Sequence, residues 1–194
     1  SIYGPEEEAA MIEVLHKNAP TSGDACIAFE KAYAEYCGVA HARACSNGTA
    51  ALFLSLLAAG VKAGDRVLTT PLTWIATAAA GATLGAEVDF VDVDPKTYNM
   101  DPEQLKKKLT PNTKVVLPVH LYGQCCAMDE IVALSKEHGF AIVEDACHAI
   151  GAEYKGRKAG SIGAARGLAE LLHDRLHLRD VKGDRRLGVA LAGG

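Results

Sequence analysis

The sequence predicts an α/β fold in which helices cover both faces of a mainly parallel sheet. Apolar runs typical of strands alternate with helix-like segments at least four times along the chain. The runs are continuously apolar, which is typical of parallel strands buried on both faces. Each run also ends in a polar turn. Ligands of such sheets bind beyond the carboxyl ends of the strands, so we expect a functional site where these turns meet.

Two helices are expected before the first strand. A proline and three glutamates after Gly4 favour a helix start, because proline suits the first turn and acids suit the positive end of the helix dipole. An apolar stripe over residues 11–15 would follow. A second helix is expected over residues 25–36. Its buried face would consist of Ile27, Phe29, Ala32, Tyr33 and Tyr36.

The next segment combines a short strand over residues 42–45, a small-residue turn over residues 46–49, and an apolar helix that ends near Gly60. In such an arrangement the free N–H groups of the helix start point toward an anion. The same turn is also good helix-capping chemistry, so the residues alone allow either a phosphate site or a simple cap. It matches neither a Walker loop nor a G-x-G-x-x-G turn.

The rest of the chain alternates strands with helices. Strands are expected within residues 64–71, 88–94, 113–120 and 139–143. Helices are expected over residues 76–85 and 128–138, and a further helix begins with Asp101 as its N-cap.

Two residues beyond strand ends each have two interpretations. Asp145 follows the last apolar run and either ends the strand and caps the next helix, or supplies a carboxylate to a cofactor. Trp74, the single tryptophan, either belongs to the core or stacks on a flat ligand. Both questions stay open at the level of the residues themselves.

Composition favours a globular, cytoplasmic protein. The 194 residues are 49% hydrophobic and 23% charged, and the net charge of -4 argues against a nucleic-acid partner. No apolar run reaches the length of a membrane span, and the first residues lack the layout of a signal peptide. The six cysteines show no C-x-x-C spacing, so we expect reduced, mostly buried thiols and no metal site.

Six blocks carry a resemblance to a known family. They are SNGTAAL (residues 46–52), PLTWIAT (71–77), VDVD (91–94), PVHLYGQ (118–124), EDACHA (144–149) and YKGRKAGSIG (154–163). In this order the blocks resemble the DegT/StrS family, the nucleotide-sugar aminotransferases among the fold-type I pyridoxal-phosphate enzymes. The resemblance implies that residues 1–163 are the N-terminal part of the cofactor-binding large domain, incomplete at its C-terminus.

The resemblance also implies a site for pyridoxal 5′-phosphate (PLP). The helix start after the glycine turn would hold the phosphate, the tryptophan would stack on the pyridine ring, and the aspartate would pair with the pyridine nitrogen. The histidine three residues later would lie near the phenolic oxygen. The implied cofactor-binding residues are Gly48, Thr49, Ala50, Trp74, Asp145 and His148.

The implied reaction transfers an amino group, usually from glutamate, to a keto group of a nucleotide-linked deoxysugar. Members of the family are homodimers whose site is completed by the partner and by a smaller C-terminal domain. Without both, apolar surface would be uncovered, so we expect poor solubility of this chain.

A family lysine that forms the Schiff base should follow Asp145 by roughly thirty residues, and the sequence has none at that distance. Lys182 lies too far along, in an arginine-rich stretch. His173 stands at about the right distance, and family members that act as sugar dehydratases carry a histidine there. A simple helix around His173 is the alternative, because its flanking residues do not match the family block.

Residues 164–194 form an atypical tail. The tail contains no Ser, Thr, Asn, Gln, Pro, Ile, Phe or Tyr but holds five of the eight arginines. A genuine next strand would carry β-branched and aromatic residues. We therefore hypothesise an out-of-frame or disordered tail, and translation of the coding DNA in its other two frames would test the first possibility.

Two further function classes remain open. One is a non-catalytic relative, which binds the cofactor, regulates, or is an inactive truncated product. The other is a nicotinamide-dependent Rossmann enzyme, which shares the sheet but would need the glycine fingerprint that this chain lacks.

Overall fold

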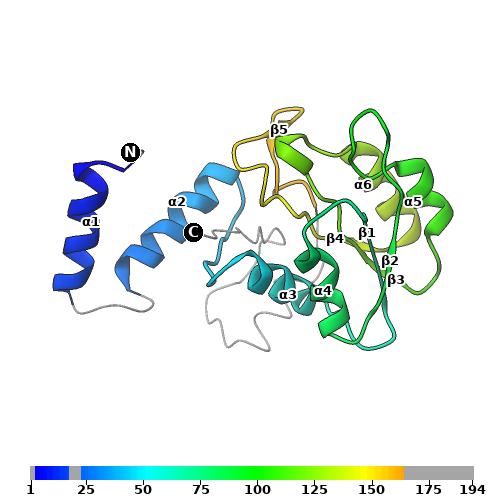
Figure 1. Ribbon diagram of the computed structural model, residues 1–194, viewed down its shortest axis with the longest axis horizontal. Helices are drawn as coiled ribbons and strands as arrows, with labels where there is room; N and C mark the ends of the chain where they lie inside the picture. Colours follow the sequence, from blue (N-terminus) through cyan, green and yellow to red (C-terminus); the bar gives the residue numbers. More distant parts are fainter. Residues whose placement is uncertain (1–2, 18–22, 164–194) are drawn as a thin grey trace.

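The computed structural model describes residues 3–17 and 23–163, which form the predicted α/β fold (Figure 1). The described residues contain a four-stranded sheet with the order β2-β1-β3-β4, in which every neighbouring pair is parallel. Each strand overlaps its predicted segment. The strands are β1 (Arg66–Thr69), β2 (Glu87–Phe90), β3 (Thr113–Val116) and β4 (Ala141–Ile142).

Helices cover both faces of this sheet, as predicted (Figure 1). One face carries α3 (Gly48–Ala58) and α4 (Ile75–Thr83), and the other carries α5 (Pro102–Lys108) and α6 (Met128–His138). Asp101 is the N-cap of α5, since its carboxylate accepts from the N–H of Glu103 at 2.8 Å. The predicted starts and ends of these helices hold to within a few residues.

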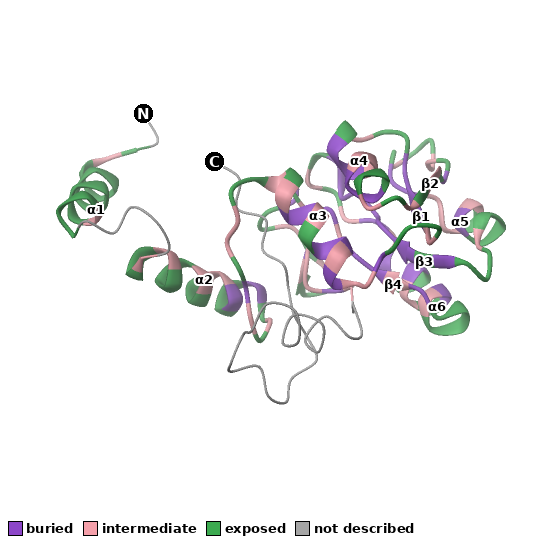
Figure 2. Cartoon of the chain, turned by 90° about the horizontal axis from the view of Figure 1, so that it is seen from below, coloured by how far each residue is buried: buried purple, intermediate pink, exposed green. Residues whose placement is uncertain are grey.

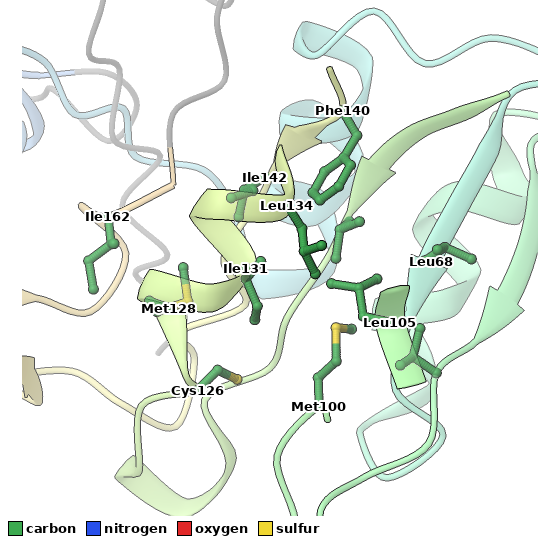
Figure 3. Close-up of a cluster of buried hydrophobic side chains, with 12 residues drawn as sticks. Leu68, Met100, Leu105, Cys126, Met128, Ile131, Leu134, Phe140, Ile142 and Ile162 are labelled. Atoms are coloured by element: carbon green, nitrogen blue, oxygen red, sulfur yellow. The ribbon is translucent and has the colours of Figure 1, made fainter. Parts of the chain in front are cut away.

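The core is divided by the sheet into two apolar clusters. Successive strand residues point to opposite faces, so Val67 packs with the α3 and α4 side while Leu68 packs with the α5 and α6 side. Figure 3 shows the second cluster, where Leu105 of α5 and Ile131 of α6 lie against the sheet. All four of these side chains are fully buried. Burial on both faces explains why the strands are continuously apolar.

The strand order creates a switch point between β1 and β3. From β1 the chain passes through α4 to β2 on one side, whereas from β3 it passes through α6 to β4 on the other side. Connections that leave neighbouring strands in opposite directions open a crevice at their carboxyl ends, and ligands of such sheets bind there. The turns that follow β1, β3 and β4 all lead to this edge.

A short antiparallel hairpin follows the sheet and packs on the start of α6. Its strands are β5 (Glu153–Tyr154) and β6 (Arg157–Lys158). Lys155 in the turn has a positive φ of 50° and donates to Asp129 of α6 at 2.5 Å. The hydroxyl of Tyr154 accepts from the N–H of Asp129 at 3.4 Å.

The two N-terminal helices leave most of their apolar side chains exposed. They are α1 (Pro5–His16) and α2 (Asp24–Cys37). In α1 no residue is buried, and Figure 2 shows that helix almost entirely in the colour of exposed residues. The predicted buried face of α2 is wrong, because Ile27, Phe29, Ala32 and Tyr36 are exposed and Tyr33 is only half-buried.

Instead, α2 contacts the rest of the molecule through its C-terminal end, where Ala34 and Cys37 are buried. Tyr36 lies under the ammonium group of Lys158, 4.7 Å from the ring centroid. An amphipathic pattern identifies a face that needs cover, but it does not identify the surface that covers it.

The strand predicted over residues 42–45 is also wrong, since this stretch belongs to no sheet among the described residues. Glu30 of α2 holds it instead. The Glu30 carboxylate accepts from the N–H of Ala44 at 2.9 Å and pairs with Arg43 at 2.8 Å. The Glu30 carboxylate thus accepts a backbone hydrogen bond that a neighbouring strand would otherwise accept.

All six cysteines are free, as expected. Only Cys37 and Cys126 are buried, however, and Cys147 is exposed, so the prediction of mostly buried thiols is wrong. None of the helices in the described ranges combines the length and the apolar content that crossing a bilayer requires.

Candidate functional site

Asp145 lies at the carboxyl edge of the sheet, three residues beyond the end of β4. Its N–H donates to the carbonyl of Pro118 at 2.9 Å, and its carbonyl accepts from the N–H of His120 at 3.0 Å. These bonds form a parallel bridge with Val119 that fixes the backbone of Asp145. The side chain is buried, with 5% exposure. No helix follows it in the described residues, because residues 146–152 form turns, so the helix-cap interpretation is wrong.

The carboxylate of Asp145 is held by the start of α4. The hydroxyl of Thr77 donates to Asp145 Oδ2 at 2.8 Å, and the hydroxyl of Thr73 lies 2.8 Å from that of Thr77. The other carboxylate oxygen accepts from the N–H of Cys147 at 3.3 Å. Thr77 is buried, so the carboxylate is oriented by a side chain that packs on the sheet. A buried carboxylate with a fixed direction is suited to pair with a cationic group of a ligand.

The N-terminus of α3 provides candidate phosphate donors. Asn47 is the N-cap, and its side chain accepts from the N–H of Ala50 at 2.8 Å. The N–H groups of Gly48 and Thr49 have no acceptor within the described part of the chain. Of the three predicted phosphate-binding residues, Gly48 and Thr49 therefore present unpaired donors, whereas the donor of Ala50 already has a partner.

Gly48 also brings the helix start and the Asp145 segment together. A Cβ atom added to Gly48 would lie 3.2 Å from the sulfur of Cys147, two residues beyond Asp145. Glycine permits this approach, since a side chain would have to displace that sulfur. The fold thus brings the helix start with the predicted phosphate donors against the segment that directly follows Asp145.

Trp74 lies at the N-cap of α4 and is 75% exposed, so the interpretation as a core residue is wrong. Its carbonyl accepts from the N–H of Thr77 at 3.1 Å, which ties its backbone to the turn that holds Asp145. An indole that is exposed in this turn is available for a flat ligand.

His148 is exposed and lies beside Tyr122 of the turn that follows β3. The two rings are nearly parallel, with an interplanar angle of 3° and centroids 6.0 Å apart. The ring nitrogens of His148 make no hydrogen bond to any described residue, so they are available to a ligand.

Glu144 is a structural residue of this edge that the sequence did not reveal. Its side chain is 2% exposed and accepts from His120 Nε2 at 2.8 Å. It also accepts the N–H groups of Gly160 at 2.9 Å and Ile162 at 2.7 Å, together with that of Gly163. Consecutive residues of an extended chain point in opposite directions, so Glu144 and Asp145 serve different faces.

The pKa of the Glu144 carboxyl is lowered. Burial alone would raise the pKa, but the hydrogen bond from His120 and those from the backbone N–H groups outweigh it. His120 Nδ1 accepts from the N–H of Cys126 at 3.2 Å, which leaves Nε2 to donate to Glu144. The Glu144–His120 pair anchors the segment that follows the hairpin. The only signal for this pair in the sequence was the acid next to Asp145.

His173, Lys182 and the whole tail over residues 164–194 lie outside the described residues. The hypotheses about an out-of-frame tail and about a histidine in place of the lysine therefore remain predictions.

Comparison with known proteins gives consistent matches. The sequence profile of the DegT/DnrJ/EryC1/StrS aminotransferase family matches residues 2–168. GDP-perosamine synthase of Caulobacter vibrioides is 50% identical over 137 residues, which make up 71% of this chain and 37% of that protein. This chain spans less than half the length of the curated relatives that it matches, for example 37% and 43%.

Solved structures agree with these matches. The crystal structure of 3-amino-5-hydroxybenzoic acid synthase superposes with a TM-score of 0.80 at 38% identity, covering 82% of this chain and 42% of that one. The structure of E. coli GDP-4-keto-6-deoxy-D-mannose-3-dehydratase with bound hydrated PLP has a TM-score of 0.80 at 30% identity, covering 84% of this chain and 44% of that one.

Proposed function

Because the chain belongs to the DegT/DnrJ/EryC1/StrS aminotransferase family, whose members include PLP-dependent sugar aminotransferases, we propose that it binds PLP at the carboxyl edge of its sheet. In the full-length protein it would take part in transfer of an amino group to a keto group of a nucleotide-linked deoxysugar. Glutamate is the proposed donor, and a homodimer is the proposed assembly. The proposed cofactor-binding residues are Gly48, Thr49, Ala50, Trp74, Asp145 and His148.

The observation that carries the proposal is the meeting of a buried carboxylate with an open helix N-terminus. Asp145 is held in one orientation by Thr77, and Gly48 approaches Cys147 closely enough to place the α3 donors beside it. PLP carries a phosphate dianion and a basic pyridine nitrogen, which are the two groups that this pair of features would bind. The residues present therefore fit the cofactor.

Four of these residues have a defined task in this arrangement. The N–H groups of Gly48 and Thr49 donate to the phosphate, with the partial positive charge of the α3 terminus behind them. Asp145, as a carboxylate, holds a proton on the pyridine nitrogen. Bound PLP supplies an electron sink for the carbanion at the reacting carbon, and the protonated ring strengthens that sink. Trp74 covers one face of the ring.

The test is removal of the charge at residue 145. Asp145→Asn keeps the size and an acceptor for Thr77 but cannot pair with a protonated nitrogen. We expect the dissociation constant for PLP to rise about 10- to 150-fold, which corresponds to about 1.5–3 kcal/mol for a hydrogen bond to a charged group. The measurement is a titration that follows PLP absorbance, with circular dichroism to verify folding.

Asp129→Asn is the matched control, because Asp129 is an exposed carboxylate of α6 that pairs with Lys155. Its PLP affinity should stay within about twofold of the unchanged chain. Equal PLP affinity of the Asp145→Asn chain and the unchanged chain would overturn the proposed site.

A further inference from the structure

The turn that follows β3 is fixed from inside the molecule by a buried amide. Asn99 is 2% exposed, and its side chain spans the turn. Its oxygen accepts from the N–H of Leu121 at 3.1 Å, and its nitrogen donates to the carbonyl of Gln124 at 2.9 Å. Both ends of the turn are therefore tied to one side chain, which restricts the conformation of the two residues between them.

Tyr122 lies at the tip of this turn in a conformation that non-glycine residues seldom adopt. Its φ is 52° and its ψ is 31°, in the left-handed region. The side chain is 84% exposed, so burial of the ring does not offset the strain. Such residues persist only where the surroundings determine them, and they concentrate at functional sites.

What the exposed ring does contact is His148. The rings stack with an angle of 3° and a centroid distance of 6.0 Å, which is within the range of offset stacking. The backbone also approaches, since a Cβ atom added to Gly123 would lie 3.5 Å from the carbonyl oxygen of His148. The turn thus contacts the ring of His148 and lies close to its main chain.

We propose that Tyr122 is a positioning residue that fixes the imidazole of His148 for contact with the cofactor. The inference rests on the proposed function, in which His148 lies beside the phenolic oxygen of PLP. Stacking occupies one face of the imidazole and leaves the two nitrogens at the ring edge, where they can hydrogen-bond a ligand. An exposed histidine without this contact would sample several rotamers.

The experiment is NMR of the histidine ring protons in a histidine-labelled chain, which observes the imidazole of His148 directly. A His148→Gln variant assigns the signal. In Tyr122→Leu, the ring-proton shifts of His148 should move to those of an unstacked histidine, and PLP affinity should fall about two- to tenfold. In Tyr122→Phe, which keeps the ring, both should remain as in the unchanged chain.

Tyr98→Leu is the matched control, because Tyr98 also has a positive φ of 60° and is 56% exposed. It should leave the His148 signals in place. If the signals do not move in Tyr122→Leu, or move equally in Tyr98→Leu, the positioning role is overturned.

Addition of PLP to the unchanged chain tests the underlying proposal separately. If PLP does not perturb the His148 signals, the proposed cofactor contact fails, even where the ring contact with Tyr122 is demonstrated. If PLP perturbs them while Tyr122→Leu does not, the cofactor site stands and the positioning role fails.

Discussion

At the residue scale, the predicted site residues at the carboxyl edge depend on partners that lie far from them in the sequence. Asp145 follows an apolar strand, a position that left both interpretations open until the family resemblance favoured a cofactor ligand. Thr77, its partner, lies 68 residues away in the chain, and no local pattern connects the two. Glu144 was equally hidden, since its acceptor role depends on Gly160, Ile162 and Gly163, which the fold brings back to it.

Glu144→Gln tests the anchoring role of this buried carboxylate. An amide offers one acceptor oxygen where the carboxylate has two, so buried N–H donors lose their partners. We expect the free energy of unfolding at pH 7 to fall by about 1–3 kcal/mol in urea denaturation. Glu137→Gln, on the exposed end of α6, should change it by less than about 0.5 kcal/mol.

The same variant has a predicted pH dependence. The pKa of Glu144 is lowered from 4.5 in the folded chain, so its contribution to stability is complete above pH 4.5 and is lost as the pH falls through the folded pKa. Below pH 4.5 the unchanged chain should therefore lose stability more steeply than Glu144→Gln. The free energy of unfolding of both chains is measured by urea denaturation at several pH values. If it falls equally steeply with pH in the two chains below pH 4.5, the linkage is contradicted.

At the element scale, the strands and the helices that cover them were predictable because the physics is local. Continuous apolar runs indicate burial on both faces, and the Asp101 cap with Pro102 marks a helix start from residues within one turn. The stretch over residues 42–45 was mistaken because a strand exists only through its neighbour. The N–H of Ala44 in this stretch donates to the Glu30 carboxylate and not to a second strand.

Gly81→Ala tests how closely α4 packs on the sheet. A Cβ atom at Gly81 would lie 2.9 Å from a methyl carbon of Val88, so the helix or the strand must shift. Overpacking of this kind costs about 1–3 kcal/mol, which outweighs the gain of about 1 kcal/mol from helix propensity. We expect a lower thermal midpoint.

Ala82→Gly is the companion variant, because residue 82 is exposed on the same helix. It should lower the stability by about 1 kcal/mol through propensity alone. A Gly81→Ala chain that melts at a higher temperature than the unchanged chain would show that α4 is not in close contact with β2.

At the scale of the whole molecule, the described chain is a covered sheet with two helices that are largely uncovered. The sheet and its helices were predictable because their apolar faces bury one another within a single stretch of sequence. The surface that covers α1 and α2 could not be predicted, because the apolar side chains of these helices do not face the described core. Those exposed by at least 39% are Met11, Ile12, Leu15, Ile27, Phe29 and Tyr36.

These side chains predict self-association or poor solubility of the chain. Replacing Leu15 and Ile27 together by glutamate should shift the chain toward smaller species in sedimentation velocity, because the apolar area that drives association is reduced. Leu54→Glu, at a 41% exposed position of α3, is the matched control and should have a smaller effect. A sharp monomeric peak with cooperative melting of the unchanged chain would refute the prediction.

The two hydroxyls behind Asp145 have a further consequence. An ionised carboxylate can only accept hydrogen bonds, so the single hydroxyl proton of Thr77 is donated to Asp145. The Thr77 hydroxyl must then accept from Thr73. Donation thus runs one way, from Thr73 through Thr77 to the carboxylate. Neutralising Asp145 would remove this constraint and allow both O–H bonds to reverse. The orientation of two threonine protons, visible to neutron diffraction, therefore reports whether the Asp145 oxygen beside Thr77 accepts or donates a hydrogen bond.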